Sequence, residues 1–339
     1  MDLDRYLLAN RGDWNRLAAL TAQVRGRPTS LRPEEVDEFV DLYQRASSQL
    51  SFARNHYDDP ALTAELTALV AGANSALYRR TASPAAIIRR FFAVSFPAAV
   101  WHIRRAVAVA ALATLVPVAV VGLWLAGNEE ALAYAGPEAQ RAAYVDEDFE
   151  AYYSSAPAGQ FATEVLVNNI QVSFLAYAAG ILLGVGSVFI LAYNGANLGV
   201  ALALFIVAGE QPKFWGLILP HGLLELSAVI LAGAAGMAMG WSLVSPGDQG
   251  RGEAFTDAAR RSVVVVLGLV LAFVTAGLIE GFVTPSGLPT AARVGVGVAV
   301  ELAFVAYLVA FGRRAAERGL TGLAGEDLEG DTARAVLSL

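Results

Sequence analysis

Long apolar runs dominate the chain after residue 105, and they predict helices that cross a membrane. Six stretches approach the roughly 20 apolar residues that a helix needs to span a bilayer core. They cover residues 106–126, 166–192, 195–209, 214–241, 262–282 and 294–312. The third stretch is short, and Pro212 and Pro220 beyond it leave open a re-entrant turn in place of a full span. We therefore expect an all-α fold, a polytopic membrane helical bundle of about six transmembrane helices over residues 106–312.

Residues 1–83 follow a different pattern, in which apolar positions recur among charged ones. Leu7, Trp14 and Leu17 lie near helical spacing and predict an amphipathic helix. Pro33 precedes two glutamates, which is typical of the first turn of another helix. We expect this region to form an N-terminal cytoplasmic helical domain of three or four packed helices.

Residues 84–105 join these two regions and alternate bulky apolar side chains with two arginine pairs. The pairs are Arg89–Arg90 and Arg104–Arg105, and phenylalanines and a tryptophan lie between them. Aromatic rings suit the headgroup layer of a membrane, and arginines suit contact with anionic lipid. We expect an interfacial elbow helix on the cytoplasmic side, or else the flank of the first span.

Basic residues are unevenly distributed between the predicted spans. Most lie on one side, namely Arg104, Arg105, Arg251, Arg260, Arg261, Arg313, Arg314 and Arg318. The other side holds only Arg141, Lys213 and Arg293. Cytoplasmic loops of membrane proteins are enriched in Lys and Arg, so we predict a multi-pass protein of the cytoplasmic (inner) membrane with both termini in the cytoplasm. Residues 313–339 would then form a cytoplasmic tail.

Residues 127–164, between the first two spans, are rich in acidic and aromatic side chains. We expect an acidic extracytoplasmic segment that is folded over the bundle, with a solvated loop as the alternative. A surface of this charge would attract cations or a basic partner.

Composition narrows the class of partner and of chemistry. Charged residues make up 16% of the chain and hydrophobic ones 56%, against about 25% charged in soluble proteins. The chain contains no cysteine, which removes disulfides, thiol nucleophiles and thiolate metal sites. The net charge of −7 argues against nucleic acid, because phosphate binding needs a basic surface. Membrane lipids are the expected partners, and a second copy of the chain or envelope proteins are further candidates.

The fourth predicted span carries His221 and Glu225, which lie on one helical face at a spacing of four residues. An ionisable side chain in hydrocarbon costs roughly 2.5–3.5 kcal/mol, so this face should point into the bundle toward polar partners. In the predicted topology, amides and carboxylates from three other spans lie at a similar depth in the outer half of the membrane. The expected buried polar network, or ligand-binding site, consists of Asn168, Asn169, His221, Glu225, Glu280 and Glu301.

Four short motifs resemble the stage II sporulation protein M family of integral membrane proteins. They are NN at Asn168–Asn169, YNGANLG from Tyr193, LPHGLLEL around His221 and Glu225, and AGLIEGFVTP around Glu280. The resemblance covers most of residues 90–312, and the N-terminal helices resemble those of actinobacterial-type members. It implies a membrane bundle, and it implies a role like that of the sporulation member, which is thought to act in a complex with cell-wall hydrolases.

Three hypotheses fit the polar site. The first is a membrane scaffold or assembly protein of the bacterial cell envelope, in which the network is structural. The second is a transporter or channel-like protein that binds a proton, cation or small solute there. The third is an intramembrane metal-dependent hydrolase, with His221, Glu225 and Glu280 as candidate metal ligands. The chain has neither a GxSxG nor an HExxH motif, so enzyme activity is not expected to be the leading role. No cofactor is expected, except that the hydrolase hypothesis leaves a metal ion possible.

Overall fold

The computed structural model describes residues 3–26, 31–57, 59–77, 84–148, 158–323 and 326. Every regular element in these ranges is a helix, which confirms the all-α fold expected from the sequence. The chain divides into two compact units, residues 1–83 and 84–339. Each unit is described by itself.

In its described residues, the first unit contains three helices, α1 (Leu3–Gly26), α2 (Pro33–His56) and α3 (Pro60–Leu77). All three pack against one another around a core of apolar side chains. The core includes Leu17, Leu20, Phe39, Leu42, Leu62 and Leu66. Trp14 is buried and donates its indole N–H to the side chain of Gln49 at 2.6 Å. The apolar positions that predicted amphipathic helices therefore form the interior of this unit.

The second unit begins with a broken helix. Its parts are α4 (Pro84–Arg90), the π-helical turn η1 (Phe91–Ser95) and α5 (Phe96–His102). A bend at Ile103 separates α5 from the next helix, α6 (Arg104–Ala126). Residues 96–100 are buried, and α5 packs against the last two helices of the chain. Ile87 and Ile88 of α4 are exposed, so this first part presents an apolar surface to the surroundings.

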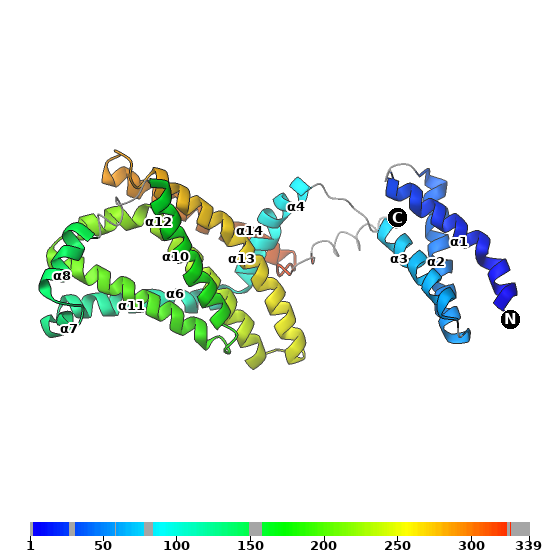
Figure 1. The fold of residues 1–339 in the computed structure, drawn as a ribbon, viewed down its shortest axis with the longest axis horizontal. Helices are drawn as coiled ribbons and strands as arrows, with labels where there is room; N and C mark the ends of the chain where they lie inside the picture. The colour runs from blue at the N-terminus through cyan, green and yellow to red at the C-terminus, as the bar shows by residue number, and fades with distance from the viewer. Residues whose placement is uncertain are drawn as a thin grey trace. The chain divides into compact units, whose positions relative to one another are not determined.

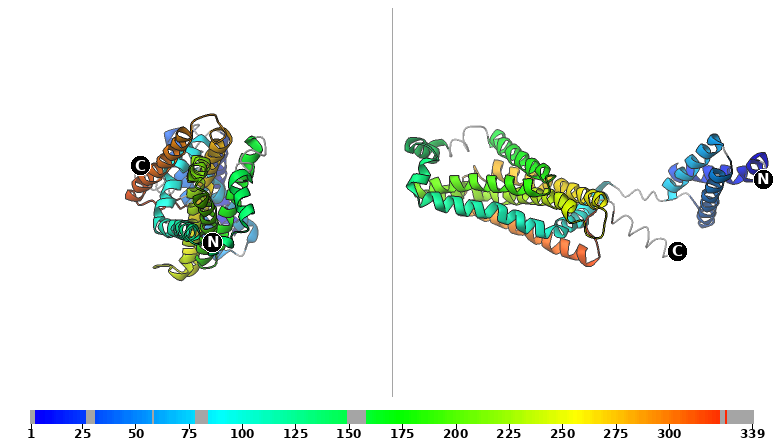
Figure 2. Two further views of the ribbon diagram at one scale, coloured as in Figure 1. Left: turned by 90° about the vertical axis from the view of Figure 1, so that its left-hand side faces the viewer. Right: turned by 90° about the horizontal axis from the view of Figure 1, so that it is seen from below.

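Five further long helices follow α6 and complete the bundle (Figure 1). They are α10 (Ala158–Ala179), α11 (Val185–Ala208), α12 (Gln211–Val244), α13 (Arg251–Phe282) and α14 (Thr290–Glu317). Within the described residues, five helices are long and apolar enough to cross a membrane, namely α6, α11, α12, α13 and α14. Figure 2 shows long helices of this unit running alongside one another.

The boundary between the second and third predicted spans differs from the expected one. The chain turns at residues 180–184, inside the predicted stretch 166–192, and α11 that follows is 24 residues long. Leu183 and Gly184 have φ angles of 54° and 81°, in the left-handed region that ends a helix. Apolar residues continue through the turn, so hydrophobicity alone does not reveal it. The expected short or re-entrant third span is therefore wrong.

Helix α12 contacts α6, α10, α11, α13 and α14. Its approach to the turn that follows α10 is close, because glycines meet there without side chains. A Cβ atom added to Gly240 would lie 1.9 Å from the carbonyl oxygen of Gly180, and one added to Gly180 would lie 2.2 Å from the carbonyl carbon of Gly236. Small residues at membrane helix contacts allow this packing.

The acidic segment after α6 forms short helices in its described part, and residues 134–137 between two of them are not helical. It contains α7 (Glu129–Ala133), α8 (Glu138–Ala143) and the π-helical turn η2 (Tyr144–Asp148). Leu132 and Val145 pack with Phe205 and Phe214 at the adjoining ends of α11 and α12. Residues 149–157 of the predicted segment, and residues 324, 325 and 327–339 of the predicted tail, lie outside the described residues.

Candidate functional site

The first polar contact joins α12 to the end of α13. His221 and Glu280 are 3% and 2% exposed, and Nδ1 of His221 faces the Oε2 atom of Glu280. The hydroxyl of Thr284 donates to the same carboxylate oxygen at 3.0 Å and lies 3.3 Å from Nδ1 of His221. A carboxylate beside Nδ1 favours the tautomer in which this nitrogen carries the proton. The three side chains therefore form one buried cluster.

The second contact joins α12 to α10. The amide Nδ2 of Asn169 donates to Oε2 of Glu225 at 2.6 Å. Glu225 is 4% exposed, and its other oxygen, Oε1, has no hydrogen-bond partner among the described residues. Together with the His221 cluster, this bond joins the His–Glu pair of α12 to α10 and to the end of α13.

The third contact joins α12 to α14. The hydroxyl of Ser227 donates to Oε1 of Glu301 at 2.6 Å, and Oε2 of Glu301 has no partner among the described residues. Asn168 is exposed, and no hydrogen bond within the described residues includes its side chain. The structure thus gathers five of the six predicted residues into three separate contacts along α12 and leaves Asn168 outside them.

Two partners in these contacts were not predicted from the sequence. Thr284 follows Glu280 by four residues, and this spacing was a usable signal. Ser227 lies two residues after Glu225 and therefore on a different side of α12, where only the position of α14 reveals its role.

The side chains do not form a metal centre of the expected kind. Within the described part of the chain, no three His, Cys, Asp or Glu side chains come together in a way that could hold a metal ion. The metal-dependent hydrolase hypothesis therefore gains no ligand set from His221, Glu225 and Glu280.

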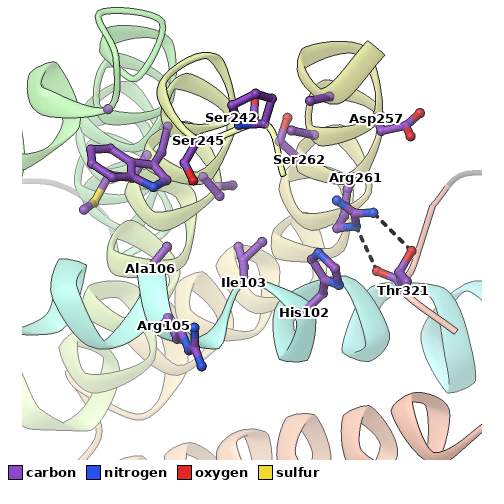
Figure 3. A pocket seen from close by; sticks show the side chains of 18 of the residues that line it. His102, Ile103, Arg105, Ala106, Ser242, Ser245, Asp257, Arg261, Ser262 and Thr321 are labelled. Carbon is purple, nitrogen blue, oxygen red and sulfur yellow. Dashed lines mark hydrogen bonds between the residues drawn. The ribbon is translucent and has the colours of Figure 1, made fainter. Parts of the chain in front are cut away.

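A cavity of about 870 Å³ lies near the other ends of these helices, away from the polar contacts. Residues from α5, α6, α11, α12, α13 and the segment after α14 line it (Figure 3). Arg261 on α13 donates from Nε and Nη2 to the carbonyl and hydroxyl oxygens of Thr321, at 3.0 and 3.1 Å (Figure 3). The lining residues are far apart in the sequence, so no local motif indicated the cavity.

His102 lies in the wall of this cavity beside Arg261 (Figure 3). Desolvation of the buried part of its ring lowers the pKa of His102, and the positive charges of Arg261 and Arg104 lower it further, against an opposite effect of Glu326. The neutral imidazole is therefore favoured at this end of the bundle.

Comparison with protein families gives two matches. A family model described as Stage II sporulation protein M matches residues 111–285, slightly more than half of the chain. A second model, a domain of unknown function called DUF8413, matches residues 4–79. The two matches fall in the two compact units of the structure.

Two curated relatives come from Methanocaldococcus jannaschii. Uncharacterized protein MJ0793 is 38% identical over 73 residues, which cover 21% of this chain and 41% of that protein. Uncharacterized protein MJ0706 is 30% identical over 120 residues, which cover 34% of this chain and 52% of that protein. The chain thus spans about half the length of the curated relatives it matches, or less. No solved structure matches it.

Proposed function

Because the chain belongs to the Stage II sporulation protein M family, we propose that this membrane protein is a scaffold or assembly factor of the bacterial cell envelope. Its bundle would hold a fixed shape in the cytoplasmic membrane and present the segment from α7 to η2 on the outer side. Envelope proteins are the partners this role requires.

The proposed topology has six spans and both termini in the cytoplasm. The helix directions alternate along the chain, and the turns that carry most of the arginines all fall at the same end of the bundle under this arrangement. Arginine enrichment at one end supports a cytoplasmic location for it.

The observation that carries the scaffold proposal is the pairing of buried ionisable groups between helices. His221 bonds with Glu280 and Thr284, and Asn169 bonds with Glu225, so α12 is tied to α13 and α10. Three cavities lie elsewhere among the described residues, and none of these three is lined by any of the five side chains. Polar groups that satisfy one another between packed helices specify an arrangement of helices and leave little room for a solute.

The test measures the melting temperature of the Glu225→Gln variant and the ion flux through proteoliposomes that contain the original chain or this variant. An amide oxygen can still accept from Asn169, so a structural role predicts a melting temperature within about 2 °C of the original chain. A structural role also predicts that proteoliposomes containing the original chain conduct protons, sodium and potassium no faster than empty liposomes.

A second candidate function, proton or cation transport, is favoured by one observation. Oε1 of Glu225 and Oε2 of Glu301 are both buried, and neither has a hydrogen-bond partner among the described residues. A buried oxygen without a partner costs about 1–3 kcal/mol unless a proton, water or ion satisfies it. Ion flux that the Glu225→Gln change abolishes would establish transport and reject the scaffold proposal.

A further inference from the structure

The cavity near the start of α13 has no role in the function proposed above. Its volume of about 870 Å³ falls within the roughly 300–1,000 Å³ of sites that bind small molecules. Helices α5 and α6 bend at Ile103 on one side of it, and residues 245–250 turn between α12 and α13 on another. The space therefore lies where helices end or bend.

One part of the cavity wall is apolar and continuous with the outer surface of the bundle. Val109, Leu183, Val185 and Trp241 line the cavity, and each is 49% to 68% exposed. Exposed apolar side chains on membrane helices contact lipid chains. A hydrocarbon chain can therefore lie along this wall without leaving the lipid phase.

Another part of the wall is polar. Figure 3 shows Ser242 of α12, Ser245 directly after this helix and Ser262 of α13, together with Arg261 and His102. The hydroxyls of Ser242 and Ser262 donate to carbonyl oxygens of their own helices. Arg105 also lines the cavity. A ligand with both an apolar and a polar part would match the two kinds of wall.

Two arginine side chains of this polar part can bind an anion. Within the described residues, Arg105 makes no hydrogen bond or ion pair, and Nη1 of Arg261 makes no hydrogen bond. Two carboxylates, Asp257 and Glu326, also line the cavity and attract Arg261, and each already accepts hydrogen bonds from other groups. Asp257 accepts from Gln249 at 3.1 Å, and Glu326 accepts from the backbone N–H groups of Thr321 and Leu323 at 2.7 and 3.1 Å.

We propose that this cavity binds a phosphate-bearing lipid. The phosphate would lie beside Arg261, and an acyl chain would follow the apolar wall that Val109 of α6 and Val185 of α11 help to form. Guanidinium groups bind phosphate through paired charge-assisted hydrogen bonds, and basic pockets between membrane helices hold anionic headgroups. Free phosphate shares the polar chemistry but would leave the apolar wall without a partner.

The experiment is native mass spectrometry of the full chain, purified in detergent and stripped of lipid. Three probes are added in parallel: dioleoyl phosphatidylglycerol, dioleoylglycerol with the same chains but no phosphate, and inorganic phosphate. The expected result is retention of one phosphatidylglycerol, with roughly tenfold weaker retention of dioleoylglycerol, which corresponds to about 1.4 kcal/mol. Inorganic phosphate should not remain bound.

Two variants and a control locate the site. Arg261→Gln removes a phosphate donor and should weaken phosphatidylglycerol retention roughly tenfold, whereas Arg260→Gln changes a neighbouring exposed arginine outside the cavity and should leave it unchanged. Ala106→Phe fills the cavity while keeping both arginines, so it carries the test if the Arg261 variant does not fold.

Two results would overturn the proposal. Equal phosphatidylglycerol retention by the original chain and the Ala106→Phe variant would place the lipid elsewhere. Binding of inorganic phosphate as tight as that of the lipid would reject the lipid as the ligand.

Discussion

The two ends of the membrane bundle carry similar polar side chains and arrange them differently. Around His221 and Glu225, groups from neighbouring helices meet directly, and each contact joins α12 to another helix. Around Arg261, polar groups surround a cavity of about 870 Å³. Helices that pack along their length force buried polar groups to pair, whereas bends and turns at helix ends leave space between them. Under the two proposals above, one end of the bundle would set its shape and the other would receive a ligand.

The largest expected effect tests whether the paired end is structural. Replacing Glu280 by Ala leaves His221 and Thr284 buried without their carboxylate. Removing one member of a buried pair typically costs about 3–5 kcal/mol. We expect a large fall in the melting temperature in detergent, measured by intrinsic fluorescence.

The control for this change is Glu253→Ala, in the exposed first turn of the same helix. Equal melting temperatures for the two variants would show that the Glu280 cluster does not hold the bundle together.

The next effect uses two adjacent asparagines. Asn169 donates to Glu225, whereas Asn168 is exposed. The Asn169→Ala change should destabilise the bundle by roughly 1.5–3 kcal/mol, because it removes a hydrogen bond to a buried carboxyl group. Asn168→Ala should change stability by less than about 0.5 kcal/mol. Chemical denaturation of both variants measures the difference, and a larger loss for Asn168 would contradict the structure.

A third prediction compares the same substitution, alanine to phenylalanine, at two positions one turn apart on α6. Ala106 lines the cavity, whereas Ala110 is 0% exposed in the apolar core. A phenylalanine at position 110 has no room and should cost about 1–3 kcal/mol. At position 106 it can enter the cavity, so we expect a change below about 0.5 kcal/mol. Similar losses in thermal unfolding would mean that the cavity is not available to a side chain.

The smallest effect concerns pH. The pKa of His102 is lowered in the folded chain, so the unfolded chain binds the proton more readily. The contribution of His102 to stability is therefore complete above its unfolded pKa of about 6.5 and declines as the pH falls below that value. We expect the His102→Gln variant to lose less melting temperature than the original chain between about pH 7.5 and about pH 5.5. An identical loss would show that His102 does not titrate in this way.

The sequence indicated the residues around His221 and Glu225 better than the cavity around Arg261, for a physical reason. His221 and Glu225 stand out because charge within an apolar run needs partners, and Asn169 and Glu280 lie at the matching depth on neighbouring helices. Asn168 was included because depth alone does not tell which face of α10 meets α12. The cavity depends on the bend at Ile103 and on the path of the chain after α14, which periodicity does not encode. The turn at residues 180–184 escaped notice because apolar residues run through it.

The short turns on either side of α11 also limit how the protein can enter its membrane during synthesis. Residues 180–184 connect α10 to α11, and Gly209 and Glu210 connect α11 to α12. A chain reaches at most about 3.6 Å per residue, so neither turn can bridge a hydrocarbon core of about 30 Å. Under the proposed topology, α10, α11 and α12 must therefore be integrated as consecutive hairpins, in the order of translation. Asn169 is then already in place when α12 delivers Glu225, and the carboxyl group finds its amide donor as it arrives.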